Sequence, residues 1–541
     1  MTCRVSGIDL FVGSRMRAWL LKGVVEVLAR VRSCALLGID AYFVEVEVDV
    51  GRGLPSFSTV GLPDAAVRES RERVLSAIRN SALEIPPRRI VVNLAPADTR
   101  KEGAGFDLAV AIGLLCATGQ LSPERLEGFV FVGELSLDGR LRGVRGVLSM
   151  AFLAKTAGVS GMIVPAENGC EAETALGEKV YTAGTLSEIV QFLRGERPLP
   201  SPVSQSESTD GDGKRRAAAP DFSEVKGQQQ ARRALEVAAA GNHNVIMVGP
   251  PGAGKTMLAR RVPSILPTLS REEAVETTRI YSAAGRLPRG AALLSLRPFR
   301  SPHHTISAAG AIGGGKTPRP GEVSLAHNGV LFLDELPEFR RDVLEALRQP
   351  IEEGHLTISR AGGTVSFPAR FMFIAASNPC QCGFFTDSVR QCNCTPTQIR
   401  GYMGRLSGPL LDRIDIHIAV PRITFREIAQ TQECESSQRI RERVLGARSV
   451  QLERYAGLPG LRTNADLGES MIKRFCLVDE SALELLKAAM ERLGLTGRAF
   501  HRILKVARTI ADLGGAELPR AEHVAEAIQY RTLDRVGFGW L

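Results

Sequence analysis

The stretch Asn244–Thr256, NVIMVGPPGAGKT, decides the fold of the centre of this 541-residue chain. An apolar run, Asn244–Val248, predicts a strand, and Met257–Val262 predicts a helix. Between them stands the pattern G-x-x-x-x-G-K-[ST], as Gly249-Pro250-Pro251-Gly252-Ala253-Gly254-Lys255-Thr256. Its glycines let backbone N–H groups wrap a β-phosphate, Lys255 offers its charge to the β- and γ-phosphates, and the Thr256 hydroxyl can ligate Mg²⁺. The chain is therefore predicted to bind ATP and Mg²⁺ on an α/β core.

Two further apolar strands end in polar side chains. Val330–Leu333 (VLFL) runs into Asp334-Glu335, and Phe371–Ala375 (FMFIA) leads to Ser377-Asn378. Doubly wound sheets place their ligands at the carboxyl ends of the strands. We expect Asp334 to hold Mg²⁺ through water and Glu335 to polarise the attacking water. Asn378 is expected to position that water from the other side of the γ-phosphate.

Two arginines further along the chain are candidate functional residues. Arg413 lies between two acids in Leu406–Asp415 (LSGPLLDRID), where a surface salt bridge is the ordinary alternative. Arg498 opens the predicted helix Ala499–Leu513. A lone arginine at a helix N-terminus opposes the helix dipole, and a bound phosphate would resolve that conflict.

Four of the ten cysteines form a cluster, Cys380-x-Cys382 and, nine residues later, Cys392-x-Cys394. Four thiolates can hold one tetrahedral Zn²⁺, although the common structural spacing is C-x-x-C. Reduced or redox-active thiols are the alternative. The other six cysteines are scattered singly, as small core residues are, and a reducing cytoplasm is the simplest setting.

The region before the phosphate loop predicts a separate α/β domain. Strands are predicted at Tyr42–Val50, Arg89–Leu94 and Gly161–Pro165, helices at Ala65–Ser81 and Asp107–Gly119, and a hairpin of Val130–Leu137 and Arg140–Leu141 turned by Asp138-Gly139. Pro198–Pro220 is rich in Pro, Ser, Gly and charge, which is typical of a flexible linker. The resulting boundaries are residues 1–26, interpreted as an upstream extension or the product of a misassigned start codon, a domain at 27–196 and a linker at 197–220.

Composition restricts the function classes. The chain has 68 Lys and Arg against 59 Asp and Glu, so its net charge of +9 fits a polyanion partner without proving one. Only 5% of residues are aromatic, which makes a broad base-stacking platform improbable. No run of eighteen apolar residues exists, and we therefore expect no membrane span.

With these motifs in place, the chain from about Val27 resembles the bacterial YifB/ComM family of magnesium-chelatase-like AAA+ ATPases. The resemblance rests on LLGIDAYFVEVEVDVGRGLPSFSTVGLPDAAVRESRERV, RRIVVNLAPAD, DFSEVKGQQQARRALEVAAAGNHNVIMVGPPGAGKT, FRSPHHTIS, GEVSLAHNGVLFLDELPEF, ASNPCQCG, SGPLLDRID and RILKVARTIADL. It implies an AAA+ core at 221–421 and a C-terminal helical lid at 422–541. The domain at 27–196 is then similar to the Lon protease domain, with a ribosomal S5 domain 2-like α/β fold.

The resemblance also assigns roles to single residues. It places Asp221 and Gln228 near the nucleotide base and ribose, and it makes Asn378 the sensor-1 residue. It identifies Arg413 as an arginine finger that reaches ATP on a neighbouring subunit, and Arg498 as the sensor-2 arginine of the lid. An arginine finger in trans implies a ring, which in this family is expected to be a homo-hexamer.

Two inserts match this branch of AAA+ proteins. One spans about 281–322 and includes His303 and His304. The other, His355–Arg370 (HLTISRAGGTVSFPAR), has the alternation of a β-hairpin with Arg360 near its tip. In related ring helicases such hairpins face the pore and move nucleic acid. A cationic tip suits phosphate contacts, so we expect Arg360 to bind DNA, with a purely structural hairpin as the alternative.

The Lon-like domain lacks the residues of a peptidase. A Lon-type site needs a Ser nucleophile and a Lys base within hydrogen-bond reach. Gly105 and Phe106 stand where the Ser would fall, and the segment Gly146–Met150 contains no Lys. We therefore expect no peptidase activity, and a DNA-binding or ring-organising role instead. A solvated basic face is an alternative for its arginine-rich helix.

The leading functional hypothesis is a hexameric, Mg²⁺-dependent ATPase motor acting on single-stranded or branched DNA. The resemblance implies branch migration or helicase activity on recombination intermediates, as in natural transformation. The alternative is the ATPase subunit of a complex that inserts Mg²⁺ into a porphyrin. The fused Lon-like domain and the cysteine cluster have no evident use in that reaction.

Overall fold

The structure is a computed structural model that describes residues 28–202, 220–288, 290–315, 318–360, 363–385, 387, 389–424, 427 and 434–531. The predicted extension at 1–26 and most of the predicted linker at 197–220 lie outside these residues. The chain forms two compact units. The N-terminal unit holds most of residues 28–202. The C-terminal unit, here called the ATPase unit after its predicted activity, holds the described residues from 220 onward together with residues 36–40 and 145–149.

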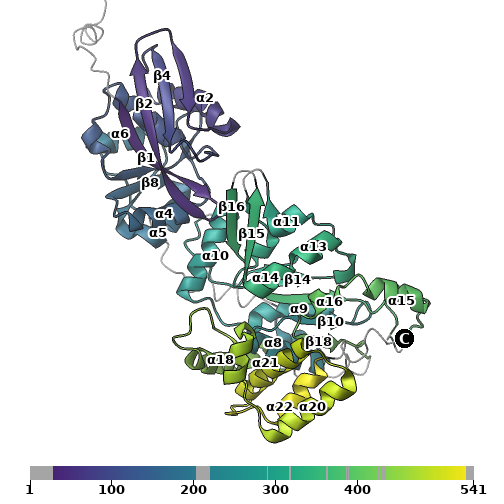
Figure 1. The fold of residues 1–541 in the computed structure, drawn as a ribbon. Coiled ribbons are helices and arrows are strands. Elements are labelled where there is room, and N and C mark those ends of the chain that lie inside the picture. Colours follow the sequence, from purple (N-terminus) through teal and green to yellow (C-terminus); the bar gives the residue numbers. More distant parts are fainter. Residues whose placement is uncertain are drawn as a thin grey trace, which may run out of the picture. The chain divides into compact units, whose positions relative to one another are not determined.

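A seven-stranded mixed sheet forms the N-terminal unit. Its order is β3(Ser56–Val60), β4(Arg89–Ala95), β2(Asp40–Gly51), β1(Ala29–Leu37), β5(Phe129–Phe131), β8(Gly161–Pro165) and β9(Val180–Ala183) (Figure 1). β2 and β4 are antiparallel, whereas β5, β8 and β9 run parallel. The helices are α2(Ala65–Asn80), α3(Asp107–Ala117), α4(Val147–Thr156), α5(Gly169–Leu176) and α6(Leu186–Arg194).

The predicted elements of this unit are present, with two differences. The predicted hairpin around Asp138-Gly139 is made by the short strands β6(Glu134–Leu135) and β7(Leu141–Arg142), while β5 joins the main sheet instead. The linker also begins later than composition indicates. Leu199 is buried, and the carbonyl of Pro200 accepts hydrogen bonds from the backbone N–H and the hydroxyl of Thr182.

The ATPase unit is built on a five-stranded parallel sheet. Its order is β11(Phe299–Arg300), β14(Val330–Leu333), β17(Met372–Ser377), β10(Val245–Val248) and β18(Ile416–Ala419). Every residue of β14 and β17 is buried, as in a sheet covered by helices on both faces. Because all these strands run the same way, the phosphate loop, Asp334 and Asn378 meet at one end, here called the carboxyl end. This confirms the predicted α/β core.

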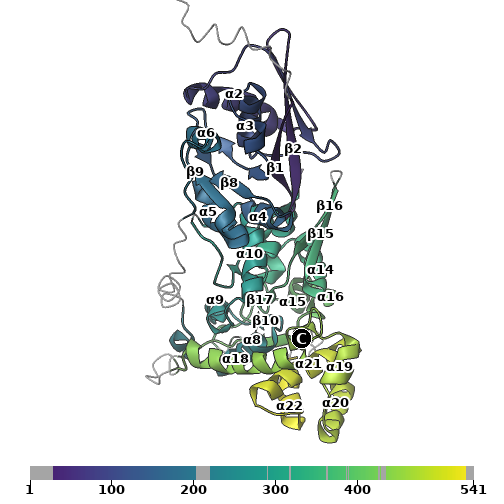
Figure 2. The ribbon, with the colours of Figure 1, turned by 90° about the vertical axis from the view of Figure 1, so that its left-hand side faces the viewer.

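The C-terminal helices form the lid. They are α18(Ser437–Arg454), α19(Glu469–Phe475), α20(Glu480–Leu493), α21(Gly497–Leu513) and α22(Ala521–Gln529) (Figure 2). α18 packs on α8(Gln229–Gly241), α9(Lys255–Ile265) and α21. Residues of the sheet and of the lid share one hydrophobic cluster. No helix in the described part of the chain is long and apolar enough to cross a membrane.

The predicted hairpin consists of β15(His355–Arg360) and β16(Gly363–Pro368), with Arg360 opposite Gly363. Leu356, Ile358, Val365 and Phe367 are buried, so one face of the hairpin joins a hydrophobic cluster of the ATPase unit. Arg360 stands at the last pair before the turn, as predicted. The turn residues 361 and 362 lie outside the described residues. The preceding insert contributes α11(Ala308–Ile312), β12(Gly313–Gly314) and β13(Arg319–Pro320).

Candidate nucleotide-binding site

The phosphate loop links β10 to the N-terminus of α9. Gly252 and Gly254 have φ angles of 79° and 90°, a region that side chains rarely adopt. A Cβ on Gly249 would lie 2.0 Å from the carbonyl oxygen of Val420, so only glycine fits there. The loop therefore keeps its backbone N–H groups at a helix N-terminus, where they can bind phosphate.

Lys255 lies buried inside the loop. Its Nζ donates hydrogen bonds to the carbonyls of Gly249 (2.6 Å) and Pro250 (3.0 Å) and to Oδ1 of Asn378 (3.1 Å). Burial lowers the pKa of Lys255 to about 8, although Asp334 and Glu335 act in the opposite direction. The structure thus brings the predicted phosphate-binding lysine and the predicted sensor-1 residue into direct contact.

Thr256 and Asp334 form the adjacent polar pair. The Thr256 hydroxyl donates to Oδ2 of Asp334 at 2.5 Å, so two oxygen atoms of the kind that Mg²⁺ prefers converge beside the phosphate loop. These residues fit a Mg²⁺ ion that is completed by phosphate oxygens and water. Glu335 follows with a φ of 53°, and its backbone N–H donates to Oδ1 of Asp334.

His304 is a neighbour of Glu335 to which the sequence assigned no role. Its Nδ1 lies 3.5 Å from Oε2 of Glu335. The two-residue strand β11 pairs in parallel with β14 just before the histidine pair, and no local pattern in the sequence indicates this contact.

The two residues predicted near the base and ribose take different places. Gln228 donates from Nε2 to the carbonyls of Ala253 (3.3 Å) and Pro421 (2.6 Å), which puts it against the phosphate loop. Asp221 instead caps a short helix and accepts hydrogen bonds from the backbone N–H groups of Ser223 and Ser437. It therefore joins the core to the first lid helix.

Arg413 and Arg498 lie at the other end of the sheet. Asp415 stands just before β18, whose first residue, Ile416, pairs with Val245, the first residue of β10, whereas the phosphate loop follows the last residue of β10. Arg413 precedes β18 and donates from Nε to Glu352 (2.9 Å). Arg498 donates to Oδ2 of Asp412 (3.3 Å). Both arginines therefore belong to the amino end of the sheet and not to the chain's own phosphate loop.

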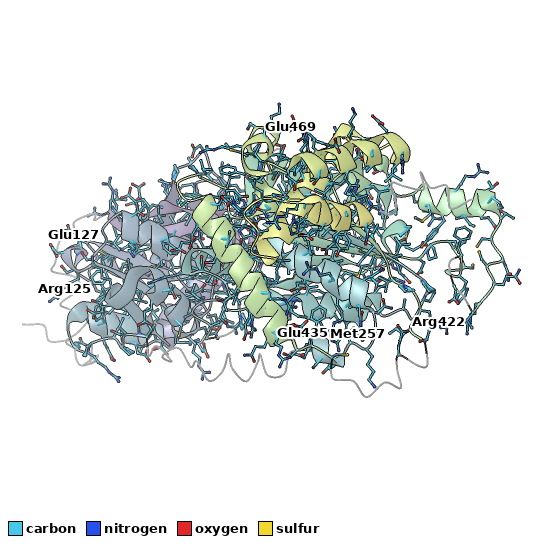
Figure 3. All side chains as sticks on the ribbon, turned by 90° about the horizontal axis from the view of Figure 1, so that it is seen from below. Arg125, Glu127, Met257, Arg422, Glu435 and Glu469 are labelled. Carbon is cyan, nitrogen blue, oxygen red and sulfur yellow. The ribbon has the colours of Figure 1, made fainter. Side chains whose placement is uncertain are left out.

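Figure 3 shows residues that flank the two ends of the sheet. Met257 of α9 and Arg422 beyond β18 lie along one side of the ATPase unit. Glu469, at the start of α19, lies on the opposite side. Glu469 and Arg498 both line a cavity of about 450 Å³ at the amino end of the sheet, together with Glu352 and Asp415.

A buried charge cluster supports the amino end. Asp415 is 1% exposed and accepts hydrogen bonds from Arg502 (2.7 Å) and from the backbone N–H of Asn244, and it lies 3.2 Å from Nδ1 of His243. Burial alone would raise the pKa of Asp415, but Arg502, His243 and Lys505 hold it well below its usual range. This cluster fixes the strand starts and was not predicted from sequence.

The four cysteine sulfurs come together as a metal site requires. All four Sγ atoms lie within 4.8 Å of one another. Cys380 lies 3.3 Å from Cys382 and 3.7 Å from Cys392, and Cys382 lies 3.5 Å from Cys392, measured between Sγ atoms. A tetrahedron with Zn–S bonds of about 2.3 Å has edges of about 3.8 Å, so the spacing fits zinc, whereas disulfides would need sulfurs about 2 Å apart. The residues present therefore fit a Zn²⁺ ion.

This cysteine cluster also touches the nucleotide site. A Cβ on Gly383 would lie 2.6 Å from Cδ of Pro251 in the phosphate loop and 3.9 Å from Cγ of Asn378. Gly383 directly follows Cys382, so the chain around the thiols packs against two parts of the predicted ATP site.

In the N-terminal unit, a buried ion pair lies next to the position expected for a peptidase nucleophile. Arg73 donates to both carboxylate oxygens of Asp107, at 2.7 and 3.1 Å, two residues beyond Gly105. Ser149 donates to the carbonyl of Ile39. Lys101 is fully buried, and its Nζ has no hydrogen-bond partner among the described residues. The absence of peptidase activity stays a prediction, and this geometry agrees with it.

Three family models match this chain, and together they leave residues 28–45, 169–202 and 220 of the described part unmatched. Residues 221–428 match the family model described as "Magnesium chelatase, subunit ChlI". Residues 46–168 match "Subunit ChlI of Mg-chelatase", and residues 434–531 match "Magnesium chelatase, subunit ChlI C-terminal".

Two curated relatives match this chain over almost its whole length, and a third matches over a shorter stretch. Competence protein ComM of Haemophilus influenzae is 45% identical over 512 residues, which cover 94% of this chain and 98% of that protein. YifB of Escherichia coli is 43% identical over 510 residues, with coverage of 94% and 98%. The magnesium-chelatase 38 kDa subunit of Cereibacter sphaeroides is 26% identical over 340 residues, which cover 56% of this chain and 88% of that protein.

Proposed function

Since the chain belongs to the YifB/ComM family of magnesium-chelatase-like AAA+ proteins, we propose that it is a ring-forming ATPase that remodels DNA. The reaction would be branch migration or helicase-type unwinding of recombination intermediates. The observation that carries the proposal is the division of phosphate-binding groups between the two ends of one sheet. The phosphate loop lies at the carboxyl end, whereas the two arginines predicted to act on the γ-phosphate lie at the amino end.

At the carboxyl end, the chain's own residues would bind and orient ATP. The phosphate loop and Lys255 would hold the β- and γ-phosphates. Asn378 would give up its hydrogen bond with Lys255 and position the attacking water instead. Glu335 orients and polarises that water for in-line attack on the γ-phosphorus. Thr256 and Asp334 would hold Mg²⁺, which neutralises charge that develops on the phosphate oxygens.

At the amino end, Arg413 and Arg498 would act on ATP bound to the next copy of the chain. Head-to-tail contacts of this kind close into a ring, for which we propose six copies. The partners that hold the two arginines, Glu352 and Asp412, are 56% and 37% exposed at their side chains. The side chain of Arg498 is itself 68% exposed, so its ion pair is weak and a phosphate can replace Asp412 at small cost, whereas the side chain of Arg413 is 18% exposed.

DNA would bind in the centre of the ring through the β15–β16 hairpin. Arg360 carries a cation to the end of that hairpin, and the buried residues behind it tie the hairpin to the ATPase core. The name of the Haemophilus relative, a competence protein, supports a role in the uptake or recombination of DNA. The N-terminal unit would serve as a DNA-binding or ring-organising platform without peptidase activity.

The cysteine cluster would bind a structural Zn²⁺ through Cys380, Cys382, Cys392 and Cys394. The spacing of the four sulfurs supports the assignment. Because Gly383, next to Cys382, lies against Pro251 of the phosphate loop, a bound metal would stabilise the carboxyl end of the sheet. Metal analysis of protein purified without oxygen should find one zinc per chain. The Cys382→Ser, Cys392→Ser double variant should contain no zinc. Less than one tenth of an equivalent of zinc in the wild type would reject the assignment.

A direct test compares ATP turnover alone and with single-stranded, duplex and three-way-junction DNA. We expect branched or single-stranded DNA to stimulate turnover and the junction to be resolved only with ATP. Arg360→Ala should reduce stimulation and the salt-dependent binding of DNA while basal turnover persists. Arg390→Ala is the matched control, because Arg390 is also an exposed cation. An ATP turnover rate that none of these DNAs changes would reject the proposal of a DNA motor.

The alternative is an ATPase subunit of a magnesium-chelatase-like complex, which the three family-model matches favour. The far higher identity to ComM over almost the whole chain favours the DNA motor. Turnover indifferent to DNA but stimulated by a porphyrin would reverse that preference.

A further inference from the structure

A small cavity at the amino end of the ATPase unit is lined by several arginines. It has a volume of about 70 Å³ and is lined by Asn242, shortly before β10, and by Phe371, directly before β17. Its charged lining residues are Arg297, Arg370, Arg448, Arg462, Glu273 and Asp466. Four guanidinium groups and two carboxylates leave an excess of two positive charges in this cavity, here called the arginine pocket.

The arginine pocket is separate from the chain's own phosphate loop. Asn242 precedes β10, whereas the phosphate loop follows the last residue of β10, Val248. The length of a four-residue strand alone separates the two places by about 13 Å. Neither Arg413 nor Arg498, the two arginines proposed to act on the ATP of a neighbouring copy, lines the pocket. Neither of the two proposed ATP contacts therefore accounts for its positive charge.

The two carboxylates of the pocket already have partners. Glu273 accepts hydrogen bonds from Nη2 of Arg297 (2.8 Å) and from Nη1 of Arg462 (3.2 Å). Asp466 accepts from the backbone N–H groups of Arg462 (3.1 Å) and Thr463 (2.8 Å), and from the hydroxyl of Thr463. The other two arginines of the pocket therefore receive no hydrogen bond from either carboxylate.

Arg370 and Arg448 keep hydrogen-bond donors without a partner. Among the described residues, the guanidinium of Arg370 makes neither a hydrogen bond nor an ion pair. Arg448 donates from Nε (3.1 Å) and Nη2 (2.7 Å) to the carbonyl of Ala239, and its Nη1 has no partner in the described part of the chain. Burial lowers the pKa of Arg448 to about 10, and the charge of Arg297 acts in the same direction. An anion in the pocket would oppose both effects.

The size and chemistry of the pocket suit a small oxyanion with two negative charges. The planar donor fork of arginine binds pairs of oxygen atoms on phosphate or carboxylate groups. A buried water needs about 10–15 Å³ of cavity, so the pocket has room for roughly five waters, or for one tetrahedral anion with four oxygens. The volume is too small for a whole nucleotide, but it admits free phosphate or the terminal phosphate of a nucleotide.

The four arginines come from both parts of the ATPase unit. Arg297 and Arg370 precede strands β11 and β17 of the core. Arg448 lies on α18, and Arg462 lies just before the short helix η6(Asn464–Asp466) of the lid. An anion that contacts all four arginines would therefore join the lid to the core.

We propose that the arginine pocket is a binding site for a phosphate-type oxyanion, which ties the lid to the core of the ATPase unit. The ligand is inorganic phosphate or the terminal phosphate of a nucleotide, and both offer the same group of oxygens to the arginines. The site is distinct from the phosphate loop, and the inference does not rest on the proposed action on DNA.

The experiment titrates inorganic phosphate into the full-length protein and measures binding by calorimetry. Lys255→Ala is the common background, so that the phosphate loop contributes little. We expect one phosphate per chain. Arg370→Ala should weaken its binding at least tenfold, because charge-assisted hydrogen bonds are lost. Arg400→Ala, which removes an exposed arginine of α15(Pro396–Met403) outside the pocket, is the matched control and should leave the affinity within twofold.

A second variant and a competitor complete the test. Arg462→Ala removes another arginine of the pocket, whose side chain is 41% exposed, and should give a similar loss, with circular dichroism as the check on folding. Displacement of phosphate by excess ADP would assign the site to the terminal phosphate of a nucleotide, and no displacement would assign it to free phosphate. Absence of binding at about 10 mM phosphate, or equal affinities in the Arg370→Ala, Arg462→Ala and Arg400→Ala proteins, would overturn the inference.

Discussion

The two ends of the five-stranded sheet hold their polar groups in different ways. At the carboxyl end, Lys255 is buried and bound by loop carbonyls and Asn378. At the amino end, the guanidinium of Arg498 is 68% exposed and paired with a surface carboxylate. A buried cradle suits a ligand that enters and is enclosed, whereas an exposed arginine suits a ligand carried by another molecule. The difference supports the proposal that each copy contributes to two different sites, each shared with a neighbouring copy.

The largest effect is expected at the carboxyl end, from Lys255→Ala. This change removes the charge on the β- and γ-phosphates in both the bound and the transition state, so affinity should fall about 10²-fold and kcat about 10³-fold. Nucleotide titration and steady-state turnover measure the two effects. Lys487→Ala, an exposed lysine on α20, should behave as wild type. Retained turnover in Lys255→Ala would break the assignment of this end.

At the amino end, Arg413→Ala should lower turnover about 10³-fold, the usual contribution of an arginine finger, while nucleotide affinity changes little. The reason is that Arg413 is remote from its own phosphate loop. Turnover and nucleotide titration, at a protein concentration where the ring persists, distinguish this from a binding defect. Arg341→Ala, whose side chain is 91% exposed, is the control. Equal losses of affinity and turnover would contradict the separation of the two ends.

At the amino end, loss of the buried carboxylate should lower the free energy of unfolding more than loss of the surface carboxylate. Asp415→Asn leaves Arg502 and Lys505 without their buried counter-charge, so the free energy of unfolding should fall by about 3 kcal/mol. Asp412→Asn, which removes only the surface partner of Arg498, should cost less than about 1 kcal/mol. Urea denaturation of both variants gives the comparison, and equal stabilities would show that the buried cluster does not fix the strand starts.

A smaller effect is expected when zinc is removed. Gly383, which follows Cys382, lies against Pro251 of the phosphate loop, so loss of the metal should loosen that loop and weaken ATP binding about threefold to tenfold, in line with the effect of supporting contacts around a site. Chelation followed by nucleotide titration measures the change, and re-addition of zinc should reverse it. Unchanged affinity in demonstrably metal-free protein would limit the cluster to a local structural role.

Sequence alone predicted much of the carboxyl end because its signals are local. The loop Gly249–Thr256 and the apolar strand before Asp334 each carry a complete pattern in consecutive residues. Because the carboxyl ends of parallel strands meet at one edge of a sheet, these patterns were expected to converge. The structure confirms this convergence for Lys255, Thr256, Asp334 and Asn378.

The rest depends on contacts between distant segments. Arg498 was predicted as a phosphate-binding residue, but only the packing of α21 shows that it lies beside Asp412 at the amino end. His304 meets Glu335 through the two-residue strand β11, which is too short for an alternating pattern to reveal. The burial of Leu199, inside the predicted linker, was not predicted, because a Pro-rich composition does not show that a segment packs on a sheet.

The central claim is that each ATP is hydrolysed between two copies, one giving Lys255 and the next giving Arg413. Mixing inactive Lys255→Ala and Arg413→Ala proteins in equal amounts, under conditions that allow subunits to exchange, tests it directly. Random mixing makes about one interface in four complete, because an Arg413→Ala copy supplies the lysine and a Lys255→Ala copy the arginine. The account predicts recovery of a substantial fraction of wild-type turnover in the mixture. Turnover no greater than the sum of the two inactive proteins would contradict it.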